Sequence, residues 1–541
     1  MTEMHKFSCG CTWPIIGKQK NPKAIPLLDI NPDKFPFCEA AWQLFARGET
    51  KGIFQLESDL GKQWSKKLRP KSAEHLSALG ALIRPGCLQA VDENGVSMTS
   101  HYCKRANFEE NVEPYHPVVD EILKSTYGSL VFQEQAMELS KAVAGFSLQE
   151  ADMLRKAMGK KLASEMAKCK KMFIEGAKKT KIVNDNQAEE IFGWIEQSQR
   201  YSFNKSHSCC YGLTGYDTAY LKSHFPVQFF TSWLFYAKDK ADSMQEIADL
   251  IEDAKNFGIN VFPPDVFRLN SNFDTDGVDI WFGITDVKGI GKSHFEKLKT
   301  SIEKHQNELD TWESFIVKCS DEVPHTTIEK LITIGGFKRY NLQRQKMIAD
   351  LKTWAEITDK EKEWIFNNIQ ISNIGEAILQ AAKTKKEGGA CASQKRADKL
   401  KDLANTLINP PCPLIDIPSW IIWSETQHLG IPLTCTVIDS CDTSQINSTC
   451  REYINGKSGL VILGVEVRRV KEVVTKAGKK PGSRMAFLSI SDSSGKIDEV
   501  ICFPDAYKEC GSLLKEGNTV LIHGERDRRS DALLVKSAYQ I

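Results

Sequence analysis

The sequence has 541 residues and a formal net charge of +1, from 71 Lys and Arg against 70 Asp and Glu. This balance excludes a chain whose bulk charge draws it to nucleic acid or membrane, so any such preference must come from local patches. Its 41% hydrophobic and 26% charged residues are ordinary for a soluble globular protein, and roughly 150 residues per domain predicts three or four domains. No apolar run approaches the ~20 residues of a membrane span, and the N-terminus does not resemble a signal peptide. We therefore expect a cytoplasmic protein, without membrane contact, whose 16 cysteines are reduced.

Residues 1–35 carry cysteines and prolines with weak periodicity, and we treat them as a separate N-terminal segment. The side chains of His5, Cys9, Cys11 and Cys38 can supply the four ligands of a zinc site. The Cys-Gly-Cys spacing is tight for such a site, and ordinary reduced thiols are the alternative. Zn²⁺ is therefore one candidate cofactor.

Residues 36–265 have apolar residues at helical spacing and few helix breakers, which predicts a mostly helical domain. Within it, residues 153–171 hold seven cations against one acid. A solvated helix face is the ordinary explanation of such a run. Two pairs of cations nevertheless flank one glycine, which gathers them near a single turn: Arg155, Lys156, Lys160 and Lys161.

The stretch RYSFNKSHSCCYG, residues 200–212, follows in the same helical block and mixes cations, aromatic rings, an amide and an imidazole. Together with the basic residues just named, it offers charge for phosphates, a flat face for a base and polar groups for its edges. A nucleoside triphosphate, with about four negative charges and one flat base, fits this set. We predict that it is bound by the four basic residues above and by Tyr201, Asn204, Lys205 and His207. For an isolated His207, a satisfied core histidine is the alternative.

Residues 266–345 begin with an alternating stretch around Asp-Gly, NFDTDGVDIWFGI (272–284), which predicts a β-hairpin. The next segment, VKGIGKSH (287–294), has the pattern of a helix-hairpin-helix, whose glycine turn exposes N–H groups that can hold a DNA phosphate. Its candidate DNA-binding residues are Lys288, Gly289, Gly291 and Lys292. A plain helix C-cap is the alternative, but a second Gly-Gly turn at 335–336 favours a tandem motif.

Residues 346–425 read as a helical segment followed by linkers: 383–396 is predicted to be flexible and 409–418 rigid by composition. Residues 426–541 alternate like strands, with one helical insert, and predict a small β-barrel of the OB-fold type. Residues 468–484 straddle a turn between the first two strands and hold seven cations, among which Lys476, Lys479, Lys480 and Arg484 are candidate ligands of single-stranded DNA. A solvated hairpin is the alternative. The predicted fold class is α+β multidomain, with a helical domain, a helix-hairpin-helix region and a C-terminal barrel.

Several long motifs occur in an order that resembles the family C replicative DNA polymerases of bacteria, the alpha subunits of DNA polymerase III. The resemblance is strongest over residues 36–345 and looser over the barrel. The motifs are TKGIFQLES (50–58), LIRPG (82–86), YGSLVFQEQ (127–135), ADMLRKAMGKK (151–161), YSFNKSHS (201–208) and PPD (263–265).

The resemblance implies that residues 36–265 are a fingers domain that binds the incoming nucleotide. It implies that Arg155 and Lys156 meet the triphosphate, where the family has two arginines, and that Tyr201, Asn204 and His207 lie around the nucleotide. The later regions would then grip duplex DNA and lie near the template strand.

Several departures from the family pattern bear on activity. The family's metal-binding aspartates belong to a palm domain before the FQLES motif, and only 53 residues precede Phe54 here. Asp274, Asp276 and Asp279 fall in the predicted hairpin and are interpreted as turn residues. A histidine-rich phosphoesterase (PHP) domain and a recognisable sliding-clamp motif are also missing. Lys156 replaces an Arg, Ser202 a Gly and Cys87 a Pro.

We therefore expect one half of a split DNA-directed DNA polymerase, inactive alone, that binds dNTP and primer-template DNA. Another polypeptide, bearing the palm and PHP domains, would hold most of the Mg²⁺ ligands, and a sliding clamp is a further candidate partner. The host would be a bacterium or a bacterium infected by a virus with a compact genome. The alternative is a non-catalytic DNA-binding replication protein derived from a polymerase.

Overall fold

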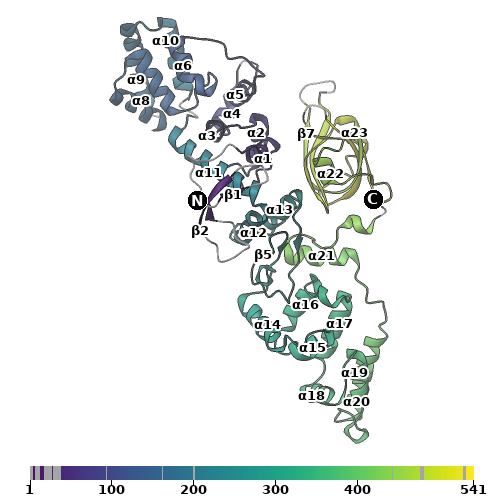
Figure 1. Ribbon diagram of the computed structural model, residues 1–541. Coiled ribbons are helices and arrows are strands. Elements are labelled where there is room, and N and C mark those ends of the chain that lie inside the picture. Colours follow the sequence, from purple (N-terminus) through teal and green to yellow (C-terminus); the bar gives the residue numbers. More distant parts are fainter. Residues whose placement is uncertain are drawn as a thin grey trace. The chain divides into compact units, whose positions relative to one another are not determined.

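The computed structural model describes three short N-terminal strands and then residues 38–541 apart from 93, 161–162, 199–201, 442, 476–480, 528–529 and 531 (Figure 1). These residues form two compact units, 1–226 and 227–541, which we describe separately. The N-terminal strands form an antiparallel sheet in the order β1-β2-β3: β1 (Met4–Lys6), β2 (Thr12–Gly17) and β3 (Leu27–Leu28). No helix in the described part of the chain is long and apolar enough to span a membrane.

The rest of the first unit is mainly helical, as the apolar spacing predicts. Its helices are α1 (Glu39–Arg47), α2 (Asp59–Leu68), α3 (Ala73–Leu82), α4 (Pro85–Gln89), α5 (Met98–Ala106), α6 (Pro117–Leu123), the 3₁₀ turn η2 (Lys124–Thr126), α7 (Gln133–Ala144), α8 (Leu148–Lys160), α9 (Ala163–Thr180), α10 (Asp185–Ser198) and α11 (Lys205–His224).

Helices α7 to α10 enclose one apolar core. On α9 the buried residues Met166, Cys169, Phe173 and Ala177 recur every three or four positions, so they form one stripe along the helix. This stripe belongs to the same buried cluster as Leu139 of α7 and residues of α8 and α10. The packing confirms the helical prediction for this region.

Helices α3 and α11 pack closely because α11 carries small residues where they meet. The hydroxyl of Ser208 donates a hydrogen bond of 2.5 Å to the carbonyl of Ser77. A Cβ on Gly212 would lie 3.0 Å from the backbone nitrogen of Ser77, so only glycine fits there without a shift. The start of α11 is fixed by Asn204, whose side-chain oxygen accepts the N–H of His207 at 2.8 Å.

The second unit continues with helices and short strands before the barrel: α12 (Pro226–Ala237), α13 (Ser243–Asn256), β4 (Val261–Phe262), β5 (Asp274–Thr275), β6 (Ile280–Trp281), η3 (Ile284–Asp286), α14 (Lys292–His305), α15 (Trp312–Cys319), α16 (His325–Thr333), η4 (Lys338–Tyr340), α17 (Arg344–Ala355), α18 (Asp359–Asn368), α19 (Ile374–Ala381), η5 (Lys385–Glu387), α20 (Gln394–Ile408), α21 (Pro418–Leu429), η6 (Val437–Ser440) and α22 (Cys450–Ile454).

The hairpin predicted at 272–284 is present, since β5 pairs with β6 in antiparallel register. A side-chain oxygen of Asp276 accepts the N–H groups of Asp279 and Val278, both at 2.9 Å. These two bonds lower the pKa of Asp276. Asp279 accepts the backbone and side-chain N–H groups of Asn260, so its carboxylate ties the hairpin to the segment before β4.

The prediction of a flexible linker at 383–396 is wrong. Thr384 forms a parallel bridge with Cys391, whose side chain is fully buried. The intervening turn closes through Gly388, which has a φ of 77°. The lysines and glycines that looked like a linker by composition are the exposed side and the turn of a small folded loop.

The C-terminal residues form a closed five-stranded barrel in the order β10-β11-β9-β8-β7, with one helix between β9 and β10. Parallel pairing of β11 with β9 closes the barrel. Alternate residues of β7 from Val461 to Val467 point into its core. The predicted barrel is therefore confirmed, with β7 (Leu460–Val474), β8 (Arg484–Asp492), β9 (Gly495–Cys502), α23 (Pro504–Cys510), β10 (Thr519–Arg526) and β11 (Leu533–Gln540).

Candidate functional site

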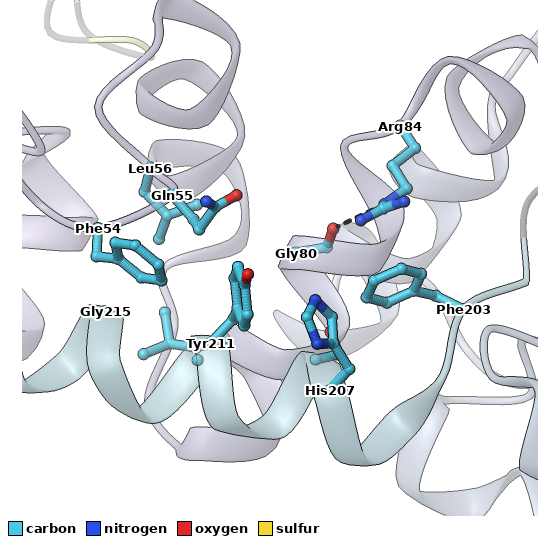
Figure 2. Close-up of a pocket in the computed structure, with 12 residues that line it drawn as sticks. Phe54, Gln55, Leu56, Gly80, Arg84, Phe203, His207, Tyr211 and Gly215 are labelled. Atoms are coloured by element: carbon cyan, nitrogen blue, oxygen red, sulfur yellow. Dashed lines mark hydrogen bonds between the residues drawn. The ribbon is translucent and has the colours of Figure 1, made fainter.

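A pocket in the first unit lies where α3 and α11 meet the loop after α1 (Figure 2). His207, one of the predicted nucleotide ligands, is among the residues that line it. Three glycines without side chains, Gly80, Gly212 and Gly215, contribute to its walls. The other lining residues include Phe54, Gln55, Arg84, Phe203 and Tyr211.

Aromatic rings form a row along one side of this pocket. The ring of His207 lies 5.3 Å from that of Phe203 and 4.1 Å from that of Tyr211, one helical turn further along α11. Tyr211 in turn lies 5.1 Å from Phe54. Figure 2 shows these rings between α11, the segment that carries Phe54 and Gln55, and the segment that carries Gly80 and Arg84. Such a row suits stacking against a flat ligand, which contributes about 1–3 kcal/mol per nucleobase.

A single cation, Arg84, stands at one end of the row. Its guanidinium carbon lies 3.7 Å from the centre of the Phe203 ring, and its Nε donates a long hydrogen bond of 3.5 Å to the carbonyl of Gly80. Arginine keeps five N–H donors in a planar fork. Among the described residues, no other hydrogen-bond partner of Arg84 is present, so its remaining donors can bind an anion at the edge of the pocket.

The segment that begins α11 is held by the start of α7. Glu134 accepts hydrogen bonds from the side-chain amide of Asn204 at 2.7 Å and from the backbone N–H of Lys205 at 2.9 Å. The N–H of Gln133 donates to the carbonyl of Phe203 at 3.0 Å. The predicted ligand Asn204 therefore uses both its oxygen, as the helix cap, and its amide to fix this segment.

The basic end of α8 lies near the same junction. A Cβ on Gly159 would lie 3.9 Å from the side-chain nitrogen of Gln133, so the last turn of α8 is beside the start of α7. Lys160 ends that helix and is exposed. The backbones of Lys160 and Lys205 thus both lie near the start of α7, and nucleotide binding by these lysines stays a prediction.

Arg155 and Lys156, one turn earlier on α8, share one carboxylate. Asp152 lies 2.8 Å from an Arg155 guanidinium nitrogen and 2.8 Å from the Lys156 ammonium. Hydrogen bonds from Lys156 and Arg155 lower the pKa of Asp152. Both cations remain partly exposed and keep further N–H donors. They are oriented by Asp152 and remain able to contact an anion.

The glycine turn predicted to bind DNA is present at the start of α14. Gly289 has a φ of 82°, which side-chain-bearing residues avoid, and Gly291 is the N-cap of the helix. Lys288 precedes the turn and Lys292 begins the helix. In the barrel, Arg484 is the first residue of β8 and pairs with Val474.

The structure describes only some of the predicted zinc ligands. Cys38 is buried, and its sulfur lies 3.1 Å from Nε2 of His224, a residue that the sequence did not suggest. Among the described residues, no group of three or more His, Cys, Asp or Glu side chains could hold a metal ion. The other zinc candidates, Cys9 and Cys11, lie outside the described residues, as do Lys161, Tyr201, Lys476, Lys479 and Lys480, and of His5 only the backbone in β1 is described. Zn²⁺ binding stays a prediction.

The predicted set of nucleotide ligands did not include five residues that line this pocket: Phe54, Gln55, Arg84, Phe203 and Tyr211. The signal was present, because Phe54 and Gln55 lie in TKGIFQLES and Arg84 in LIRPG, two of the motifs that carry the family resemblance. Phe203 and Tyr211 lie close to His207 because they are near it along the chain. The other three come near it through tertiary packing, of the loop after α1 and of α3 against α11, which no local pattern gives.

Comparison with known proteins identifies three regions of the chain. A family model described as the bacterial DNA polymerase III alpha subunit finger domain matches residues 16–181, a helix-hairpin-helix motif matches 258–347, and an OB-fold nucleic acid binding domain matches 461–541. The finger match ends before the segment at 203–211.

Similarity to curated proteins extends over almost the whole chain. DNA polymerase III subunit alpha of Aquifex aeolicus is 30% identical over 513 residues, and that of Thermus aquaticus is 30% identical over 531 residues; each alignment covers 94% of this chain and 39% of the relative. The protein of the same name from Pseudomonas aeruginosa is 30% identical over 543 residues, covering 94% of this chain and 42% of the relative. The chain thus spans about two fifths of the length of these relatives.

Proposed function

Because this chain belongs to the family of bacterial DNA polymerase III alpha subunits, we propose that it binds an incoming dNTP and primer-template DNA as the fingers-bearing part of a replicative DNA polymerase. The observation that carries the nucleotide assignment is the aromatic row of Phe203, His207 and Tyr211, with Arg84 at one end. The base stacks on this row, and the sugar lies toward Gln55.

The triphosphate meets cations in this proposal. Lys205 approaches it from α11, and Lys160, Lys156 and Arg155 approach it from α8. Glu134 of α7 fixes the start of α11 through Asn204 and the backbone of Lys205. A polyanion in a partly dry site needs several fixed donors, and each charge-assisted hydrogen bond contributes about 1.5–3 kcal/mol. Asp152 orients Arg155 and Lys156 before the nucleotide arrives.

Phosphoryl transfer to a primer needs two metal ions held by carboxylates, and we assign these to a palm-bearing second polypeptide. The carboxylate of Asp276 is engaged in the hairpin turn, and that of Asp279 holds Asn260. The described residues offer no cluster that fits a metal, so we derive no step through Mg²⁺ within this chain. Its residues bind and orient the nucleotide and the DNA.

Two regions support the assignment of DNA as a ligand. The glycine turn before α14 presents backbone N–H groups at a helix start, which bind a phosphate without reading sequence. The barrel is an OB-fold, a fold that often carries single strands. Sequence-independent binding suits a replicative enzyme.

The proposal is tested by primer extension and by nucleotide binding. The full chain with primer-template, Mg²⁺ and four dNTPs should give no extension, and addition of a palm-bearing polypeptide of this family should restore it. A dATP that carries a fluorescent group on its sugar should bind the full chain, and Arg84→Ala should weaken that binding, whereas Arg47→Ala, an exposed residue paired with Glu49, should not.

Robust extension by the pure chain, with contaminating polymerase excluded, would refute the split-enzyme role. Loss of DNA affinity with unchanged nucleotide affinity in Arg84→Ala would place the pocket on DNA. That result would favour a non-catalytic DNA-binding protein.

A further inference from the structure

Gln55 has a backbone conformation that residues with side chains disfavour. Its φ is 65°, in the left-handed region, which residues other than glycine rarely adopt. Of the described residues that line the pocket beside α11, Gln55 alone has a positive φ. Strain of this kind persists only where the surrounding structure holds the residue, and it is common at ligand-binding sites. The contacts that hold Gln55 therefore bear on what its side chain does.

The loop after α1, which carries Gln55, is fixed on α11 by a buried lysine. The ammonium of Lys222 donates to the carbonyls of Glu49 and Lys51 at 2.9 and 2.8 Å. Lys222 is fully buried, and lysine is almost never buried in full unless its ammonium is engaged. These bonds hold the loop just ahead of Gln55.

The turn itself is fixed by the residues on either side of Gln55. The N–H of Phe54 donates to Oγ1 of Thr218 on α11 at 3.1 Å. The N–H of Leu56 donates to the carbonyl of Ile53 at 3.1 Å, which closes the turn. Ile53 and Leu56 are both buried. The backbone of Gln55 is therefore held in its strained conformation by buried neighbours and by α11.

The carboxamide of Gln55 is exposed within the pocket. In the part of the chain that the structure describes, it makes no hydrogen bond, although Gln55 lines the pocket. Figure 2 shows the side chain between Phe54 and Gly80, above the ring of Tyr211. A carboxamide offers two N–H donors and an acceptor oxygen. The strained turn thus presents an unused polar group to the pocket.

The ligand group that meets this carboxamide has to be common to all four dNTPs, since a replicative polymerase accepts each of them. The aromatic row suits any base, because every base has a flat face. A polar contact with a base edge would favour some bases over others, because their donors and acceptors differ. The deoxyribose is shared by all four, and its 3′-hydroxyl both donates and accepts hydrogen bonds, as a carboxamide does.

We propose that Gln55 is a specificity-determining residue of the nucleotide pocket, whose carboxamide hydrogen-bonds the 3′-hydroxyl of the incoming deoxyribose. The strained turn holds the carboxamide in position before the nucleotide arrives, so less conformational entropy is lost on binding. A dideoxynucleotide, which lacks this hydroxyl, leaves the carboxamide without that bond. The inference rests on the proposed function in one respect, that this pocket binds a dNTP.

The test is isothermal titration calorimetry of the full chain with unlabelled dATP and with 2′,3′-dideoxy-ATP. The wild-type chain should bind dATP about two- to tenfold more tightly, the range that one neutral hydrogen bond gives. Gln55→Ala should abolish this preference by weakening the binding of dATP and leaving that of the dideoxynucleotide unchanged. The loss should be equal for dATP, dCTP, dGTP and dTTP.

Gln55→Gly separates a ligand contact from a structural role. Glycine adopts a φ of 65° without strain, so this variant should unfold at the same temperature as the wild type or at a higher one. It should nevertheless lose the preference for dATP, because the carboxamide is gone. Asn341→Gly is the matched control, because Asn341 is an exposed amide residue with a φ of 51° outside the pocket. It should leave nucleotide binding unchanged.

An equal loss of both nucleotides in Gln55→Ala, or a wild-type chain that binds them equally well, overturns the contact with the 3′-hydroxyl. A loss that differs among the four dNTPs places the carboxamide on a base edge and overturns it too. A lower unfolding temperature of Gln55→Gly overturns the ligand role in favour of a structural one. A wild-type chain that binds neither nucleotide overturns the proposed function itself, so the two failures are distinguishable.

Discussion

The pocket beside α11 and a depression between α13 and the barrel both have charged side chains in their lining, but these charges have different neighbours. In the depression between α13 and the barrel, the charged side chains form ion pairs with one another. Glu252 of α13 is buried and lies 2.9 Å from Arg468 of β7 and 3.4 Å from Lys496 of β9. Arg468 also pairs with Glu466 at 2.8 Å.

The pocket beside α11 has the opposite character. Among the described residues, Arg84 contacts the Phe203 ring and makes one long hydrogen bond, and the rings of His207 and Tyr211 lie at the surface. The difference teaches that the density of charge does not identify a binding site. A binding site is identified by hydrogen-bond donors and ring faces that the protein itself does not engage, because a ligand gains nothing from groups that are already paired.

The largest effect should come from breaking the ion pairs at the barrel. Glu252→Ala removes the buried carboxylate shared by Arg468 and Lys496, which keep Glu466 and Asp498 as partners. The loss of a hydrogen bond to a charged group costs about 1.5–3 kcal/mol. The free energy of unfolding of the second unit should fall by about that amount. Urea denaturation, with hydrogen exchange of the β7 amides as the readout, measures it. Glu303→Ala, at an exposed pair with Lys299, should change it by less than about 0.5 kcal/mol.

In the reconstituted polymerase, Arg155→Ala should lower kcat/KM for nucleotide about ten- to a hundred-fold, because 1.4 kcal/mol corresponds to about tenfold. Steady-state primer extension measures this. Affinity for primer-template without nucleotide should change far less, and Lys178→Ala on α9, which pairs with Asp185, is the control. Equal loss of DNA affinity would argue that α8 serves the DNA.

A third prediction concerns a buried carboxyl outside both regions. Burial raises the pKa of Asp286 to about 6, although its carboxylate accepts the N–H of Phe273. Because the folded state binds this proton more tightly than the unfolded state, its contribution to stability is present at low pH and is lost as the pH rises through about 6. Asp286→Asn should therefore stabilise the chain by about 1–2 kcal/mol at neutral pH. It should also flatten the pH dependence of the free energy of unfolding between about pH 4 and 6.

The smallest predicted effects are on stability, at two helical glycines of the first unit that differ in the space around them. Gly212→Ala places a methyl group 3.0 Å from the backbone of Ser77, so overpacking of about 1–3 kcal/mol opposes a gain of about 1 kcal/mol in helix propensity. Gly193→Ala on α10 meets nothing within 4 Å and should stabilise by about 0.5–1 kcal/mol. Thermal unfolding measures both, and stabilisation by Gly212→Ala would show that α3 and α11 can separate without cost.

Local patterns predicted the helical stripe of α9, the hairpin around Asp276, the glycine turn before α14 and the barrel, because each depends on neighbours in sequence. They did not predict that Arg84 lies on Phe203, since the contact joins residues on separate elements. The partner of Cys38 was likewise out of reach, because His224 is at the far end of α11. At 383–396, composition alone missed the burial of Cys391.

The most direct test of the nucleotide-binding claim is photocrosslinking of an azido-dATP probe to the full chain, followed by mass-spectrometric mapping of the labelled peptide. The account predicts that label displaced by excess dATP lies on the peptide that contains Phe203, His207 and Tyr211, and that it is lost in Arg84→Ala. Displaceable label confined to the barrel, or no displaceable label under conditions where the chain binds primer-template, would contradict the account.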